Sequence, residues 1–265
     1  MTVMSGIGMA IDGDSGVASL VNPQGTSRAI LVCEHASNLM PERFGGLGLS
    51  KEQLTSHIAW DPGALELSLR LSSLLDAPLV HQRYSRLLYD CNRPPHAADA
   101  VPRMSEIHEI PGNADLDAEA LAARAQAYYF PFREALSGFI DARMALPQVP
   151  VLVTVHSFTP VYFGKPRSVE IGILHDADPR MALAMADHLK AVCAHDIRLN
   201  EPYGPQDGVT HTLREHALPR AIANVMIEIR NDLLVDADSV NAIAVLLADA
   251  ISAANSRMEG ERQHV

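Results

Sequence analysis

The apolar positions of this chain are concentrated in short continuous runs, and several of these runs end in a polar side chain. Continuous apolar runs are typical of strands that are buried on both faces of a parallel sheet. Six segments are therefore predicted to be strands: Ala29–Val32, Pro78–His81, Leu87–Cys91, Val149–His156, Ser168–His175 and Ala221–Ile229.

Apolar residues at helical spacing fill much of the chain between these runs. The predicted helices are Ala64–Leu75, Asp117–Leu146 with a kink or break near Pro131, Pro179–Cys193, a short helix ending near His216, and Asp236–Ala254. Strands that alternate with helices favour an α/β sandwich with a largely parallel or mixed sheet. Leu39–Ala59 and Val101–Asn113 lack periodicity and are expected to be loops, the second of them over the site or as an insertion.

Composition and charge limit the class of protein. The 265 residues are 48% hydrophobic and 20% charged, as in ordinary globular proteins. A single domain over residues 28–256 is expected, with a flexible lead-in at 1–27 and a tail at 257–265. The 21 Lys and Arg against 32 Asp and Glu give a formal charge of −11, which argues against broad binding to nucleic acid or an anionic membrane.

The same data predict a cytoplasmic protein. No basic segment precedes the apolar residues of the N-terminus, as a signal peptide would require. No apolar run approaches the length of a membrane span. The three cysteines, an odd number without close spacing, are expected to be reduced thiols.

Three chemically useful side chains stand at or near the carboxyl ends of predicted strands, namely His35, His156 and Glu228. In open α/β sheets, ligands bind outside these strand ends. Two imidazoles and one carboxylate are a common ligand set for catalytic zinc, which lowers the pKa of its water from about 15.7 to roughly 7. One such histidine is more often structural, but two favour a metal site, with Glu228 as general base.

Two further motifs supply candidate partners. Asp61 precedes Pro62 at the start of the predicted helix Ala64–Leu75, so it could cap this helix, ligate a metal, or do both. Asn92 and Arg93 follow a predicted strand and precede a proline pair that stiffens the backbone. A loop arginine is usually a solvated charge, but one held in this way is suited to bidentate binding of a substrate carboxylate.

Taken in order, these segments resemble the N-formylglutamate amidohydrolase family over residues 29–247. The segments are EHASN, WDPGA, YDCNRP, a strand ending in HS, THTLREHA and IEIRND. The resemblance implies a three-layer sandwich similar to zinc carboxypeptidases and the aspartoacylase group. It also implies that His35 and His156 are metal ligands, that Asn92 and Arg93 bind the substrate carboxylate, and that Glu228 is the general base and acid.

The resemblance implies hydrolysis of an N-formyl or other N-acyl acidic amino acid, such as N-formyl-L-glutamate from histidine degradation, with Zn²⁺ or another divalent metal. The relatives have a glutamate three positions after the first histidine, where this chain has Asn38, a weak zinc ligand. Asp61 is therefore expected to be the other ligand, and Glu34 is expected to point to the opposite face. The candidates for a second contact with substrate carboxylate are Arg230, Arg86, His211 and His216.

Two rival functions are also compatible with the sequence. Cys33 could be the nucleophile of a thiol amidase, although a cysteine inside an apolar strand is usually an inert small hydrophobe. Alternatively, the chain could be a non-catalytic ligand-binding or regulatory protein with the same fold. The joint presence of two histidines, the Asn-Arg pair and Glu228 argues against this second rival.

Overall fold

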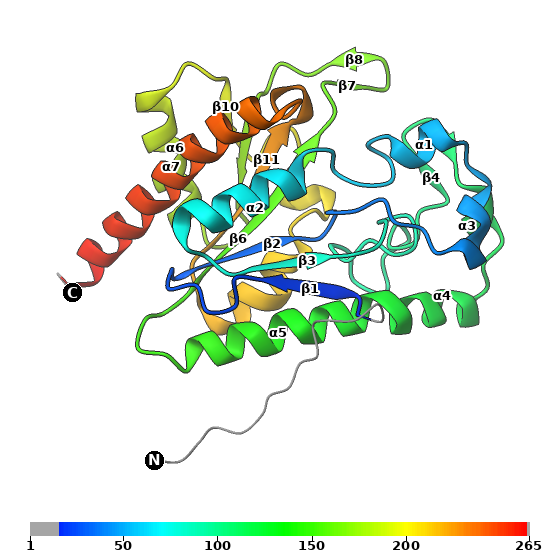
Figure 1. Ribbon diagram of the computed structural model, residues 1–265, viewed down its shortest axis with the longest axis horizontal. Coiled ribbons are helices and arrows are strands. Elements are labelled where there is room, and N and C mark those ends of the chain that lie inside the picture. Colours follow the sequence, from blue (N-terminus) through cyan, green and yellow to red (C-terminus); the bar gives the residue numbers. More distant parts are fainter. Residues whose placement is uncertain (1–15, 264–265) are drawn as a thin grey trace.

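A seven-stranded sheet forms the centre of the computed structural model, which describes residues 16–263 (Figure 1). Its strands are β1 Ala18–Val21, β2 Ala29–Cys33, β3 Leu79–Gln82, β6 Val151–Phe158, β9 Ile171–Leu174, β10 Ile197–Leu199 and β11 Asn224–Arg230. They lie in the order β1-β3-β2-β6-β11-β9-β10. Only the β1–β3 and β11–β9 pairs of this sheet are antiparallel, so the predicted mixed, largely parallel sheet is confirmed.

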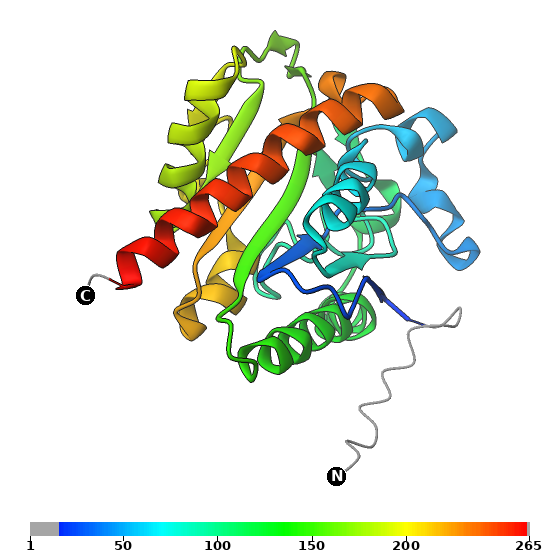
Figure 2. The same cartoon turned by 60° about the vertical axis from the view of Figure 1, so that its left-hand side comes forward.

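Helices cover both faces of the sheet, which confirms the three-layer sandwich (Figures 1 and 2). One face packs against α2 Ala64–Leu75, α6 Arg180–Val192 and α7 Ala237–Gln263. The other face packs against α5 Phe130–Met144 and the turns around it. Alternate residues of β6 enter the two cores, because Val153 belongs to the first and Leu152 to the second.

The long helical segment that precedes β6, residues 118–144, is broken near Pro131 as predicted. α4 Ala118–Arg124 continues into a π-helical turn at Ala125–Tyr129, and α5 then begins just ahead of Pro131. Proline lacks the N–H that would bond to the preceding turn, so the change in helix type at this point has a direct local cause.

The C-terminal helix α7 is longer and more apolar than expected. Its segment Ala237–Gly260 is long and apolar enough to cross a membrane, contrary to the expectation from the sequence. However, one side of it packs into the core with α2 and α6, through Val240, Ala244, Leu247 and Ile251. The helix also continues to Gln263, so most of the segment assigned to a tail is helical.

Several smaller elements differ from the predictions. Residues 87–91 form turns and irregular backbone and not a strand, because the Leu88 amide bonds to the Ser85 carbonyl and the Asp90 amide to the Ala100 carbonyl, not to a neighbouring strand. Strand β1 lies within the expected flexible lead-in, whose first fifteen residues are outside the described part. The expected loops contain η1 Glu42–Gly48, α1 Lys51–Thr55, α3 Pro111–Ala114 and the hairpin of β4 Met104–Ser105 and β5 His108–Glu109. A second hairpin joins β7 Val161–Tyr162 to β8 Lys165–Pro166.

Candidate active site

A turn directly after β2 brings His35 to the edge of the sheet. The strand ends at Cys33, and Glu34 and His35 lie in the turn. The His35 carbonyl accepts a hydrogen bond of 2.9 Å from the Asp61 amide, which ties this turn to the segment before α2. Two loops that are distant in sequence are therefore held together by their backbones.

His156 and Glu228 lie side by side on neighbouring parallel strands. Their Cα atoms are register partners in the β6–β11 pair, so both side chains emerge on the same face of the sheet. Both residues are buried. Gly172 of β9 is the register partner of Glu228 on its other side, and a Cβ atom there would lie 3.2 Å from the Cβ of Glu228.

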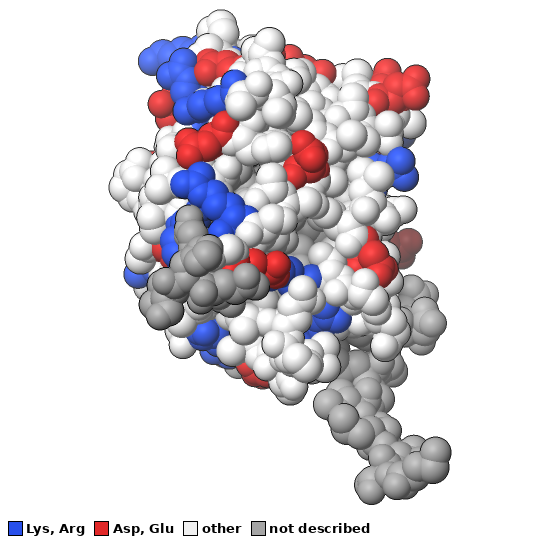
Figure 3. Space-filling model, turned by 90° about the vertical axis from the view of Figure 1, so that its left-hand side faces the viewer, with Lys and Arg blue, Asp and Glu red and all other residues white. Residues whose placement is uncertain are grey.

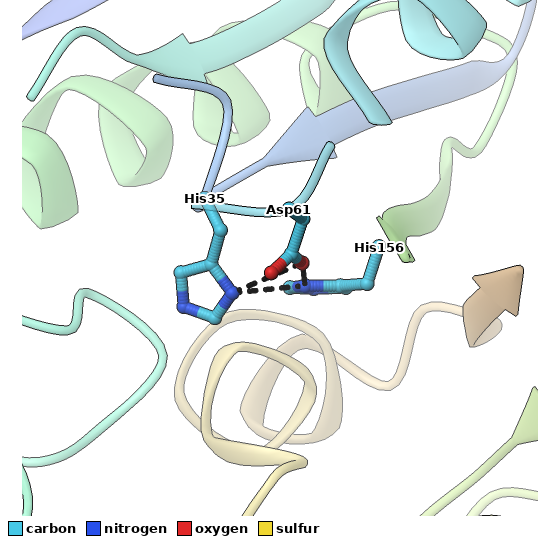
Figure 4. A group of neighbouring side chains, drawn as sticks. All are labelled: His35, Asp61 and His156. Carbon is cyan, nitrogen blue, oxygen red and sulfur yellow. Dashed lines mark hydrogen bonds and ion pairs between the residues drawn. The ribbon is translucent and has the colours of Figure 1, made fainter. Parts of the chain in front are cut away.

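His35, Asp61 and His156 point toward one another (Figure 4). Oδ2 of Asp61 lies 3.2 Å from Nδ1 of His35 and 3.0 Å from Nδ1 of His156, and the two Nδ1 atoms are 3.3 Å apart. One ligand atom from each residue lies within 4.8 Å of the others, in a buried group that could hold a metal ion. The structure thus brings together the three residues proposed as metal ligands.

Asp61 does not cap helix α2. The residue before the helix is Gly63, whose backbone is left-handed at φ 81°, and no side chain caps the helix. The carboxylate is instead directed to the histidines and to Arg86, whose Nη1 lies 3.3 Å from Oδ1. Asn38, the alternative ligand, donates its amide to the Leu54 carbonyl and lies outside the group.

Each histidine has a carboxylate at its other ring nitrogen. Oδ1 of Asp90 lies 2.7 Å from Nε2 of His35, and Oε2 of Glu34 lies 3.1 Å from Nε2 of His156. Glu34 therefore faces the site, and the expectation that it points away is wrong because the chain turns immediately after Cys33. Carboxylates in this position fix the tautomer and orientation of metal-binding imidazoles.

The charges of this buried group are mutually compensating. Burial and Arg86 act to lower the pKa of His35, but Asp90 and Asp61 outweigh them and raise it. Burial would raise the pKa of Asp90, yet His35 and Arg86 hold it well below its usual range. Arg86 forms ion pairs with both Asp61 and Asp90, so its positive charge is compensated by these two carboxylates.

Glu228 differs from the other carboxylates. Burial raises its pKa to about 7, and the nearby histidines compensate only part of this effect. Its Oε2 atom is buried and has no hydrogen-bond partner among the described residues. A carboxyl group that titrates near neutral pH and keeps an oxygen available is suited to general base and acid chemistry.

A cavity of about 530 Å³ is lined by His35, Asp61, His156 and Glu228, and also by Asn92 and Arg93. Arg93 pairs with Asp99, which is exposed, through a contact of 2.7 Å. The Asn92 side chain donates to the Val209 carbonyl and accepts from the Thr212 amide, so it joins two loops at the cavity wall. Ser105 of β4 also lines the cavity, which places the 101–113 segment at its edge.

The comparisons with known proteins identify the family of the chain. The family model of N-formylglutamate amidohydrolases matches residues 27–235. The chain belongs to the N-formylglutamate amidohydrolase family. A gene product from Agrobacterium tumefaciens has a crystal structure that is 50% identical in sequence, with a TM-score of 0.90 over 92% of this chain and 96% of that one.

A second solved structure is a more distant neighbour. The N-formylglutamate amidohydrolase from Ralstonia eutropha is 16% identical, with a TM-score of 0.66 over 92% of this chain and 99% of that one. At this identity the likeness concerns the fold alone. Among curated proteins, none matches the sequence.

Three of the residues predicted from sequence lie away from the cavity of this family member. Arg230 binds Glu170, Asp232 and two backbone carbonyls. His211 is hydrogen-bonded to the hydroxyl of Tyr129. His216 is buried, and neither it nor the other two lines the cavity. Their proposed contact with substrate therefore receives no support from their positions.

Sequence reasoning missed Asp90, Glu34 in its observed orientation, and Arg167, which lines the cavity beside Phe158 and Tyr203. Asp90 and Glu34 both lie inside motifs that were recognised, next to a residue given a role. Arg167 follows the β7–β8 hairpin, and its sequence neighbours carry no signal of a site.

The position of Cys33 argues against a thiol nucleophile. The residue is fully buried in the core formed with α2, on the opposite face of β2 from Val32. Burial, reinforced by Asp61 and Glu34, raises the pKa of its thiol well above the usual range. The thiolate form that a nucleophile requires is therefore strongly disfavoured.

Proposed function

We propose that this chain is a metal-dependent amidohydrolase that cleaves an N-formyl or other N-acyl acidic amino acid, with N-formyl-L-glutamate as the first substrate to test. One observation carries the proposal. The buried group of His35, Asp61 and His156 shares a cavity with Glu228, in a chain of the N-formylglutamate amidohydrolase family. The products would be L-glutamate and formate.

The donor set fits a divalent cation. Two imidazoles and one carboxylate are typical ligands of catalytic zinc, so we expect Zn²⁺ or another divalent metal on His35, Asp61 and His156. Such a metal would lower the pKa of a water molecule and polarise the substrate carbonyl. Asp90 pairs with the outer nitrogen of His35 and Glu34 with that of His156, the positions from which carboxylates orient metal-binding imidazoles.

Glu228 moves the proton in this proposal. As the water oxygen bonds to the acyl carbon, an oxygen of the Glu228 carboxylate takes the water proton. The same carboxyl group then gives this proton to the leaving nitrogen while the C–N bond breaks. The acyl group leaves as a carboxylic acid and the amino acid leaves with a free amine, so one water is consumed.

Arg93 is the proposed contact for the substrate carboxylate close to the reacting amide. It lines the cavity and lies near enough to Asp90 to contribute to the low pKa of that carboxyl. Guanidinium binds carboxylate through two parallel hydrogen bonds. Asn92 supports Arg93 by fixing the adjoining loops.

We also propose that the protein acts in the cytoplasm, in histidine degradation. Its three free cysteines are in line with this location.

The test is metal analysis of protein purified without a histidine tag, combined with formate release from N-formyl-L-glutamate. We expect about one metal per chain, formate release, and loss of both in Asp61→Asn but not in the exposed Asp249→Asn. Metal without formate would overturn the substrate and leave the metal site standing. Neither metal nor formate would overturn both, and loss of activity on alkylation but not on chelation would favour Cys33.

A further inference from the structure

Three arginines line the cavity, and they differ in how their charge is compensated. Arg86 pairs with two carboxylates, and Arg93 pairs with Asp99. Within residues 16–263, Arg167 has no carboxylate partner. Its hydrogen bonds go to two neutral oxygens, the hydroxyl of Tyr203 at 2.8 Å and the Thr159 carbonyl at 3.5 Å.

Aromatic rings surround the Arg167 guanidinium. Its Cζ atom lies 4.3 Å from the ring centre of Tyr162, 4.8 Å from that of Tyr203 and 5.6 Å from that of Phe158. Stacking on aromatic faces stabilises an arginine without cancelling its charge. All three rings line the same cavity, so the cation and its apolar walls form one continuous subsite.

The subsite is held in place before any ligand binds. The Arg167 amide donates to the Pro160 carbonyl at 2.8 Å, which closes the β7–β8 hairpin, and the Arg167 carbonyl accepts from Nη1 of Arg230 at 3.2 Å. The tip of the hairpin is fixed by a hydrogen bond of 2.6 Å from the Phe163 amide to Oε1 of Glu106. A cation fixed in this way loses little conformational freedom when a ligand binds.

We propose that Arg167 and its aromatic neighbours bind the carboxylate of the substrate that is remote from the reacting amide. The inference rests on the proposed function, in which Arg93 takes the nearer carboxylate. Arg93 is near enough to Asp90, the carboxylate that pairs with Nε2 of His35, to lower the pKa of that carboxyl, whereas Arg167 lines the cavity just after the β7–β8 hairpin. The rings offer apolar walls to the methylene groups that join two carboxylates, so the preferred substrate is an aliphatic N-acyl dicarboxylic amino acid.

The test compares two substrates that differ only at the remote group, N-formyl-L-glutamate and N-formyl-L-glutamine. Arg167→Met keeps a side chain that can pack between the rings but removes the charge. We expect KM for the glutamate derivative to rise about 10- to 100-fold with kcat little changed, and KM for the glutamine derivative to change less than about 2-fold. Arg198→Met, at an exposed arginine paired with Asp196, makes the same charge change as a control.

Equal effects on the two substrates, or none on either, would overturn the proposal and leave Arg167 a structural residue of the hairpin. Arg167→Lys restores the charge without the planar stack and is expected to recover part of the preference. Calorimetric binding of L-glutamate and L-glutamine to protein treated with a chelator gives a readout without turnover. If Arg167→Met loses only the preference for binding L-glutamate over L-glutamine, the subsite is supported even when N-formyl-L-glutamate is not hydrolysed. Failure of the subsite and failure of the proposed function can therefore be distinguished.

Discussion

The imidazole of His156 is held from both sides, because Nε2 lies 3.1 Å from Oε2 of Glu34 and Nδ1 lies 3.0 Å from Oδ2 of Asp61. Glu34 and His156 face each other as an ion pair in the interior, where neither is exposed to water. The pair makes Glu34 the group that decides which ring nitrogen is available to a metal.

Replacing Glu34 with glutamine is therefore expected to weaken metal binding by about 10- to 100-fold. The amide keeps the shape of the side chain but no longer favours a proton on Nε2. Metal affinity measured by competition with a chromogenic chelator checks this, and Glu66→Gln, at an exposed glutamate of α2, is the matched control. An unchanged affinity in the Glu34 variant would contradict the assigned role.

Glu228→Gln is expected to lower kcat by about 10²- to 10⁴-fold, the usual contribution of a general base, while the bound metal is retained. The variant preserves the size of a buried side chain whose register partner is His156. Steady-state kinetics together with metal content test this, with the exposed Glu134→Gln as control. Unchanged turnover in Glu228→Gln would remove it from the mechanism and favour a non-catalytic role for the residue.

Gly63→Ala is expected to destabilise the fold by about 1–3 kcal/mol. Gly63 has φ 81°, and an added Cβ atom would lie 2.6 Å from the Cβ of Leu234. Since Asp61 is two residues earlier, metal binding should weaken as well. Gly138→Ala is the control, because a Cβ there meets nothing within 4 Å and alanine favours the helix by up to about 1 kcal/mol. Chemical denaturation of both variants measures the difference.

His216 is expected to make the protein acid-sensitive. Burial lowers its pKa to about 4, whereas an unfolded histidine has a pKa of about 6.5. As the pH falls from about 6.5 to 4, the unfolded state binds the proton first, so stability is lost over this window, by up to about 3 kcal/mol.

Comparing free energies of unfolding between pH 4 and 7 tests the role of His216. His216→Met should flatten the pH dependence relative to the wild type, because methionine binds no proton in this pH range. The Nδ1 atom of His216 has no hydrogen-bond partner among the described residues, so the substitution breaks no hydrogen bond at this atom. His188→Met, at a partly exposed histidine paired with Asp249, should leave the slope unchanged. A parallel slope in His216→Met would show that other groups cause the acid sensitivity.

The sequence was sufficient to select candidate site residues at the ends of buried strands. His35, His156 and Glu228 could be selected because an apolar run stops at or beside a polar side chain, and this pattern is local. Arg167 could not be found in this way, because its lack of a carboxylate partner among the described residues is a property of the folded structure. The orientation of Glu34 could not be predicted either. The alternation of side chains in a strand stops at Cys33, and Glu34 already lies in the turn that follows.

The strand order has a consequence for the synthesis of the chain. β11 pairs with β6 on one side and β9 on the other, although it is the last strand in sequence. A nascent chain that has reached residue 220 already contains all three metal-ligand candidates, but its sheet has a gap at the centre and lacks Glu228. The central hydrogen-bonded ladder, and with it the complete candidate site, can form only when residues 224–230 have left the ribosome.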